Sequence, residues 1–295
     1  MWAVYALLSA AFAGTNAVLA KFGSDKTSAV AASAVRTTAV LAVSSLAMVI
    51  ARGTASLASI DPRTVIVLTL SAAATAAAWV CYFRALAGGD VDRVSAVDKL
   101  STVLALSGGV LFFGEGLTVH KIIAILLITS GVWWSCGKKS NRIDKFNTQK
   151  RGWLVWAMLS AGLVAASTLL SKAGIGKISP EAALVARTGF VLIFTWAAAL
   201  VKKEAREIRL IGGKTALILL TSGVLTGLGW LCYFRALAGG SAGEVHAVDK
   251  LSILVTVVLS RIVFREKRGG RYLCGLVLIV AGILWLYFTS DCRMV

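Results

Sequence analysis

The stretch from Trp79 to Ser101, WVCYFRALAGGDVDRVSAVDKLS, occurs twice in this chain. Its second copy runs from Trp230 to Ser252 as WLCYFRALAGGSAGEVHAVDKLS, with only six substitutions. Both copies carry charged residues inside sequence that is otherwise apolar. Because such charges need partners when they are buried, any fold of this chain has to accommodate the pair of copies.

The repeat extends outward from this stretch over almost the whole chain. A single offset of 151 residues aligns the two halves without a gap. We therefore predict two repeats, residues 1–137 and 152–295, joined by a basic linker at 138–151. The identities between the halves include Trp2 with Trp153, Arg36 with Arg187, Asp98-Lys99 with Asp249-Lys250, and Glu115 with Glu266.

The composition assigns the chain to the membrane proteins. Of its 295 residues, 58% are hydrophobic and only 15% are charged, whereas soluble domains carry roughly 25% charged residues. Each half contains five apolar segments long enough to cross a bilayer. The predicted fold is therefore all-α, with ten transmembrane helices. The segments run over 2–22, 27–50, 64–87, 94–114, 119–137, 153–173, 180–201, 213–238, 245–265 and 270–289.

An odd number of spans in each half predicts that the halves have inverted topology. Inverted repeats are typical of transporters, which bind their solute near the membrane midplane and expose it alternately to either side. Lys and Arg outside the segments gather in the loops on the side of the 138–151 linker. The positive-inside rule then places this linker in the cytoplasm and both termini outside.

Other classes of protein are disfavoured by the same sequence. The net charge of +17 reflects these basic loops, and no aromatic-interleaved basic patch points to nucleic acid. The five cysteines form no CxxC or other metal-ligand spacing. We find no HExxH, GxSxG or phosphate-binding loop, so we expect neither an enzyme nor a cofactor.

Charged residues inside the segments are the first candidates for a functional site. Arg36 lies near the middle of the second segment, and an isolated charge there costs at least about 2.5–3.5 kcal/mol. We expect Arg36 to pair with Asp98, and Arg187 to pair with Asp249. These pairs either tie two helices together or form a gate or coupling site, with proton or ion coupling left open. The candidates for gating or coupling are Arg36, Asp98, Lys99, Arg187, Asp249 and Lys250.

A polar and aromatic stripe supplies the second set of candidates. Steps of four, four and three residues place four side chains on one helix face in each half. Such a face suits the lining of a cavity for a small amphipathic or cationic solute, although the tyrosines also suit anchoring at the interface. Asn16, which aligns with Ser167, would make the lining asymmetric. The stripes are Ser71, Thr75, Trp79 and Tyr82, and Ser222, Thr226, Trp230 and Tyr233.

The motifs together resemble a known family. An Arg-Thr pair early in the second segment, WxCYFRALAxG, AVDKLS and the FxxE that ends at Glu115 resemble EamA-type members of the drug/metabolite transporter superfamily. The chain is similar to a fusion of two single-repeat members. The resemblance implies a ten-helix transporter with a central cavity, and it implies cytoplasmic termini, opposite to the loop charges.

We therefore expect a multi-pass protein of the plasma membrane that acts as a secondary transporter. The expected solute is a small polar or amphipathic metabolite, moved by alternating access and exported, as in several members of the family. The alternative is a flippase for a lipid-linked headgroup, with Arg36 and Arg187 as an anion site. A membrane protein without flux agrees less well with buried charges in both halves. The oligomeric state does not follow from the sequence.

Overall fold

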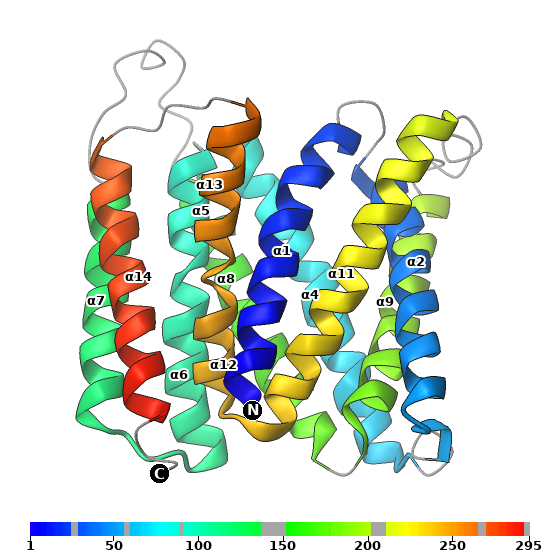
Figure 1. Cartoon of the computed structure of the whole chain (residues 1–295), viewed down its shortest axis with the longest axis horizontal. Helices are drawn as coiled ribbons and strands as arrows, with labels where there is room; N and C mark the ends of the chain where they lie inside the picture. Colours follow the sequence, from blue (N-terminus) through cyan, green and yellow to red (C-terminus); the bar gives the residue numbers. More distant parts are fainter. Residues whose placement is uncertain are drawn as a thin grey trace. The chain divides into compact units, whose positions relative to one another are not determined.

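The computed structural model describes residues 1–24, 29–55, 60–88, 91–136, 152–176, 178–201, 211–264 and 270–291. The predicted linker at 138–151 lies outside this part of the chain. The described elements are α-helices (Figure 1). They are α1 (Trp2–Ser24), α2 (Ala29–Ile50), α4 (Pro62–Gly88), α5 (Val91–Asp98), α6 (Leu100–Phe113), α7 (Val119–Cys136), α8 (Gly152–Ile175), α9 (Pro180–Val201), α11 (Gly213–Gly239), α12 (Ala242–Asp249), α13 (Ser252–Phe264) and α14 (Gly270–Asp291).

The all-α membrane class predicted from the composition is confirmed. Eight helices are long and apolar enough to cross a membrane, and Val119–Ser135 is a shorter apolar helix. The remaining predicted segment, 245–265, is helical as α12 and α13. Large apolar side chains such as Leu111, Phe112 and Trp133 are exposed on the helices, as expected for surfaces that face lipid.

Two of the predicted membrane segments, 94–114 and 245–265, are each interrupted once. Each segment is divided at its Asp-Lys-Leu sequence, into α5 and α6 at Lys99 and into α12 and α13 at Lys250. The amide of Lys99 donates to Ala96 O, and Thr102 N donates to Lys99 O. These bonds span three residues rather than four, so one tight turn replaces the regular α-helical hydrogen bonds. A charged Asp-Lys pair within a membrane span can be satisfied at such an irregular point.

The helices form two compact units, which do not coincide with the two sequence repeats. Unit 1 comprises Met1–Ala76, Leu170–Gly240 and Leu251–Glu266. Unit 2 comprises Ala77–Leu169, Ser241–Lys250 and Lys267–Val295. Each unit therefore takes helices from both repeats, and α4 and α8 contribute to both units.

Close backbone approaches hold unit 1 together. Helix α1 packs against α11 and α13, and α2 packs against α9 and α11 (Figure 1). A Cβ on Gly223 would lie 2.7 Å from Arg36 O and 2.6 Å from Ala39 Cβ. A Cβ on Gly227 would lie 3.1 Å from Val43 Cβ. The small-xxx-small pattern on α11 thus brings it close to α2, which sets the position of Arg36.

The same device operates in unit 2, where α7 packs along α14 and α6 packs along α12 (Figure 1). A Cβ added to Gly131 on α7 would lie 2.7 Å from Gly275 O, and a Cβ added to Gly282 on α14 would lie 3.1 Å from Ala124 O. Gly131 and Gly282 are equivalent positions of the two repeats, as are Ala124 and Gly275. The contact between α7 and α14 is therefore made from the same surface on both helices.

Candidate functional site

The guanidinium of Arg187 binds two hydroxyl groups inside unit 1. Arg187 lies on α9 and is buried. Its Nε donates to Ser71 Oγ at 3.2 Å, and its Nη2 donates to Thr75 Oγ1 at 2.7 Å. Both hydroxyls lie on α4, one turn apart, and Ser71 Oγ also lies 2.8 Å from Ser171 Oγ. The predicted polar stripe of α4 thus binds an arginine of the other repeat.

Aromatic rings complete the surroundings of Arg187. Its guanidinium carbon lies 4.8 Å from the centre of the Trp230 ring and 5.6 Å from that of Phe234. Both rings belong to α11, and such contacts stabilise a buried cation by about 2 kcal/mol. In the structure the protein's own Arg187 stacks on the Trp230 ring, and the lining of a solute cavity by Trp230 stays a prediction.

Arg36 occupies the equivalent position of the first repeat and also binds hydroxyl-bearing residues of α11. Its Nη2 donates to Thr226 Oγ1 at 3.1 Å. The Asn16 amide fits best with its oxygen toward this pair, where it accepts from Arg36 Nη2 and from Thr226 Oγ1, each at 3.1 Å. In that orientation the amide nitrogen of Asn16 donates to Ser222 O at 3.0 Å. We call these four residues the Arg36 cluster.

The two arginine sites show that polar contacts are exchanged between the repeats. Thr226 is the equivalent of Thr75, so each arginine binds the threonine of the opposite repeat. The expected pairs with Asp98 and Asp249 join residues of different units and stay predictions. The sequence did not predict that each arginine would bind the threonine of the opposite repeat, although the repeated Arg-Thr and Ser-xxx-Thr positions were visible in it.

The two sites also differ in how fully they are satisfied. Arg187 is 6% exposed, whereas the side chains of Arg36, Asn16 and Thr226 are only partly buried. The Nε of Arg36 is itself buried but has no hydrogen-bond partner among the described residues. Because a guanidinium carries five N–H donors, Arg36 retains capacity for another acceptor.

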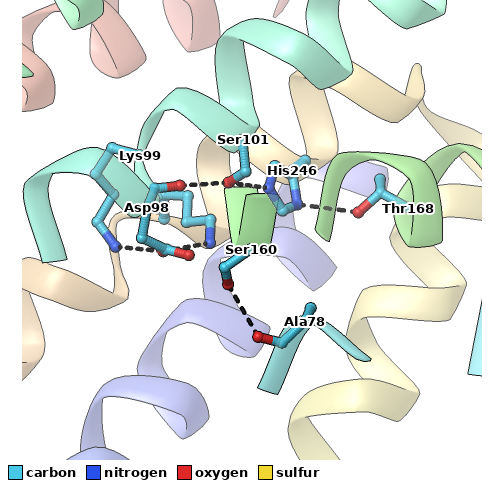
Figure 2. Close-up of polar contacts among 8 residues, drawn as sticks. Ala78, Asp98, Lys99, Ser101, Ser160, Thr168 and His246 are labelled. Atoms are coloured by element: carbon cyan, nitrogen blue, oxygen red, sulfur yellow. Dashed lines mark hydrogen bonds and ion pairs between the residues drawn. The ribbon is translucent and has the colours of Figure 1, made fainter. Parts of the chain in front are cut away.

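In unit 2 the charges of the two Asp-Lys pairs meet. Asp98 Oδ2 accepts from Lys250 Nζ at 3.0 Å and from Lys99 Nζ at 3.3 Å (Figure 2). The structure therefore brings together three of the predicted gating residues, Asp98, Lys99 and Lys250, in an ion-pair cluster at the turns that interrupt the helices.

A buried histidine lies beside this ion-pair cluster. His246 on α12 bonds to Ser101 Oγ at 3.1 Å through Nε2 and to Thr168 Oγ1 at 3.3 Å through Nδ1 (Figure 2). Ser101 also donates to Asp98 O at 2.6 Å, which satisfies a carbonyl at the interrupted turn. Sequence reasoning did not identify Ser101 or Thr168, although Ser101 is the last residue of the repeated AVDKLS motif.

Glu115, the last residue of the FxxE motif, connects three elements of unit 2. It follows Gly114, whose left-handed φ of 64° ends α6. Glu115 Oε1 accepts from Ala242 N at 3.1 Å, at the start of α12, and Oε2 accepts from Lys121 Nζ at 3.0 Å. A carboxylate at a helix N-terminus satisfies a free N–H and the helix dipole.

The arginine of each CYFRAL motif stacks on an aromatic residue of the other repeat. Arg84 lies over Trp156 at 4.7 Å in unit 2, and Arg235 lies over Tyr5 at 5.7 Å in unit 1. Tyr5 and Trp156 are equivalent positions. Arg235 also donates to Glu181 Oε1 at 2.7 Å, a bond for which the first repeat has Val30 instead of an acid.

The remaining predicted stripe residues have less defined roles. Tyr82 packs against a small apolar cluster that contains Ala85, Val94, Val97 and Ala157. The side chains of Trp79 and Tyr233 are partly buried. Among the described residues no group of His, Cys, Asp and Glu is arranged to hold a metal ion. The structure thus gathers the polar candidates into a hydroxyl-arginine region in unit 1 and an ion-pair cluster in unit 2.

Comparison with known proteins identifies the family. The model of the EamA-like transporter family matches twice, over residues 1–136 and 151–288. The chain belongs to the EamA-like transporter family. Its architecture is that of two EamA repeats, and it is a multi-pass protein of the plasma membrane whose family transports small molecules across lipid bilayers.

Three relatives show how the similarity is distributed. An uncharacterized transporter in the cobO 3′ region of Sinorhizobium sp is 44% identical over 131 residues, which are 44% of this chain and 92% of that protein. The uncharacterized transporter YxxF of Bacillus subtilis is 28% identical over 210 residues, 70% of this chain and 64% of that protein. The probable 4-amino-4-deoxy-L-arabinose-phosphoundecaprenol flippase subunit ArnE of Pseudomonas aeruginosa is 37% identical over 60 residues, 20% of this chain and 52% of that protein.

A solved structure shares the fold over the full length. The protein described as "Crystal structure of protein" aligns with a TM-score of 0.77 at 15% identity, covering 99% of this chain and 98% of its own. At this identity the match supports the EamA fold alone. The Sinorhizobium relative has about the length of one repeat of this chain.

Proposed function

We propose that this EamA-like protein is a secondary transporter that exports a small polar or amphipathic metabolite by alternating access. One observation carries the proposal. Arg36 and Arg187 lie inside apolar helices and are held by hydroxyls of the opposite repeat. Charged groups within membrane spans are costly and mark solute or ion pathways. Inverted-repeat transporters bind their solute where the two repeats meet, and each of these arginines lies among helices of both repeats.

The ion-pair cluster of unit 2 is proposed as the gating or coupling element. Its residues Asp98, Lys99 and Lys250 lie, with Asp249, at the tight turns of two interrupted helices. A small change at such a turn alters the direction of the helix beyond it. Rearrangement of these charges would therefore be linked to movement of α6 and α13. The residues proposed to line a solute site are, in unit 1, Asn16, Ser71, Thr75, Ser222, Thr226, Trp230 and Tyr233, and, within unit 2, Trp79 and Tyr82.

Counterflow in liposomes tests this function. The purified protein is reconstituted with a high internal concentration of an unlabelled solute, and uptake of the same labelled solute is followed. Amino acids, amines, carboxylates and sugars form the panel. We expect saturable counterflow for one class and its loss in Asp98→Asn. The proposal fails if no solute shows counterflow above that of protein-free liposomes.

A second candidate function has a specific observation in its favour. The 37% identity over 60 residues links part of this chain to a subunit named as a probable flippase of a sugar-modified lipid carrier. A flippase would move labelled undecaprenyl-phosphate-linked sugar between leaflets, measured by loss of accessibility to an external reagent. Flipping of this lipid without counterflow of any soluble compound would favour the flippase over the metabolite transporter.

A further inference from the structure

The Arg36 cluster is less completely buried and less completely hydrogen-bonded than the equivalent Arg187 site. It comprises Arg36 on α2, Asn16 on α1, and Ser222 and Thr226 on α11. The side chain of Arg36 is partly exposed about seven residues, or roughly 10 Å, into its helix. A guanidinium that faced lipid at this depth would be strongly disfavoured. Its exposed part is therefore expected to face water or a solute.

No carboxylate of unit 1 neutralises Arg36 among the residues that the structure describes. Two acidic side chains of this unit are described, and Glu181 is engaged by Arg235 at 2.7 Å. The other, Asp61, is exposed just before α4 begins. Asp98 of unit 2 already has Lys250 and Lys99 within 3.3 Å. The charge of Arg36 is therefore uncompensated within its own unit.

The donors around Arg36 suit an oxyanion. Its Nη2 is used by Thr226 and Asn16, while its buried Nε makes no hydrogen bond among the described residues. The planar fork of an arginine binds carboxylate and phosphate oxygens through parallel N–H bonds. The Thr226 hydroxyl and the Asn16 amide fix the orientation of this fork, which lowers the cost of ordering it when a ligand binds.

The equivalent arginine provides an internal comparison. Arg187 uses Nε for Ser71 and Nη2 for Thr75, and it stacks on Trp230. The first repeat thus leaves unused the Nε–H that the second repeat binds internally. The two arginines occupy equivalent positions of the repeats, so the difference lies in their surroundings: Arg187 is fully packed, whereas Arg36 keeps an unused donor.

We propose that the Arg36 cluster binds the negatively charged group, carboxylate or phosphate, of the solute that this protein transports. The inference rests on the proposed transport function and narrows its substrate class to anions. The Arg36 guanidinium contacts the anionic group of the solute, and Asn16 and Thr226 hold that guanidinium in position. Arg187 supports the packing of unit 1.

Thermal unfolding of the purified protein tests the charge preference directly. The probes are matched acid and amide pairs, phenylacetate with phenylacetamide and aspartate with asparagine, together with inorganic phosphate. Phosphatidylglycerol in nanodiscs, compared with phosphatidylcholine, tests a lipid source of the same oxyanion. We expect an acid or phosphate to raise the unfolding temperature and its neutral or zwitterionic counterpart to have no effect.

Variants assign the effect to the cluster. Arg36→Gln is expected to weaken the binding of that anion by about tenfold or more, because a charge-assisted hydrogen bond is lost, and Arg36→Lys by less. Thr221→Ala is the matched control, since Thr221 is an exposed residue of α11 whose hydroxyl bonds only its own helix, to Leu217 O at 2.8 Å. This control should bind as the unaltered protein does.

Several results would overturn the inference. Equal stabilisation by acid and amide, no stabilisation by any of the anions, or undiminished anion binding in Arg36→Gln would each do so. The outcome is independent of the transport test. If a neutral or cationic solute shows counterflow and no anion binds, the transport function stands and the anion site is wrong. If an anion binds, its binding is lost in Arg36→Gln, and no solute shows counterflow, the anion site stands and the transport function is wrong.

Discussion

At the scale of single residues, Arg36 and Arg187 show that equivalent positions acquire different environments. Both donate to a threonine on the third helix of the opposite repeat. Arg187 is enclosed by the rings of Trp230 and Phe234, whereas Arg36 has the small amide of Asn16 beside it. An aromatic enclosure excludes water and strengthens each polar contact inside it, so Arg187 should contribute more to stability.

Replacing Arg187 by glutamine tests this difference. The change removes two charge-assisted hydrogen bonds and a cation–π contact, and it leaves Ser71 and Thr75 with fewer partners. We expect a loss of about 2–4 kcal/mol in the free energy of unfolding, measured by thermal or denaturant unfolding in detergent. Arg36→Gln should cost clearly less. Equal losses in the two variants would contradict the distinction between them.

Asp98 is the residue on which the ion-pair cluster depends. Asp98→Asn would leave the largely buried Lys99 and Lys250 facing each other without their acid. Breaking a buried pair in this way costs about 3 kcal/mol, so we expect lower stability and loss of counterflow. Stability is read from thermal unfolding and insertion from the yield of monodisperse protein.

Exchanging the two charges tests whether stability depends on the ion pair itself or only on having charged residues at these positions. The double variant Asp98→Lys with Lys250→Asp keeps both signs on the same two helices. We expect the double variant to be more stable than Asp98→Asn, since it restores the attraction between residues 98 and 250. Full counterflow in both Asp98→Asn and Asp249→Asn would show that these aspartates have no gating role and only hold helices together.

At the scale of elements, the AVDKLS motifs determine where two membrane segments are interrupted. The sequence alone indicated long apolar segments at these places, because hydropathy does not report on hydrogen bonding over a single turn. In the structure, Lys99 and Lys250 lie at tight turns, and the Ser101 hydroxyl donates a hydrogen bond to the Asp98 carbonyl. The charges of both motifs then meet in unit 2, which is a tertiary effect.

The α7–α14 contact makes a prediction about helix packing. A Cβ on Gly275 would lie 2.7 Å from Gly131 O and would collide with Ser135 Oγ. We expect Gly275→Ala to cost about 1–3 kcal/mol of stability, because the backbones would have to separate.

Gly162→Ala on α8 is the control for this substitution. A Cβ at Gly162 meets no atom within 4 Å, and alanine favours a helix by about 0.5–1 kcal/mol over glycine. Thermal unfolding of the two variants should therefore shift in opposite directions. A similar loss in both would show that any side chain on a helical glycine is harmful here.

At the scale of the whole molecule, each compact unit is built from both repeats. Neither repeat contains the threonine that its own arginine binds, since Arg36 binds Thr226 and Arg187 binds Thr75. A single half therefore exposes groups that the other half would bury. Single-repeat relatives of about this length would meet the same need through a second chain.

Separate expression of the halves tests this interdependence. When residues 1–150 and 152–295 are produced together, we expect the untagged half to copurify with the tagged half in mild detergent. Either half alone should give aggregated or oligomeric protein in size-exclusion chromatography. A monomer with cooperative unfolding from one half alone would contradict the exchange of contacts between repeats.

The sequence by itself determined the membrane class, the repeat, the segments and the residue types of the candidate site. It could do so because apolar length and internal identity are local properties of the chain. Tertiary structure decided the partners: Thr226 for Arg36, Lys250 for Asp98, and Trp230 for Arg187. Each pair joins residues more than forty positions apart. The first two pairs join opposite repeats and the third joins two helices of the second repeat, so only the packing of distant helices brings the partners into contact.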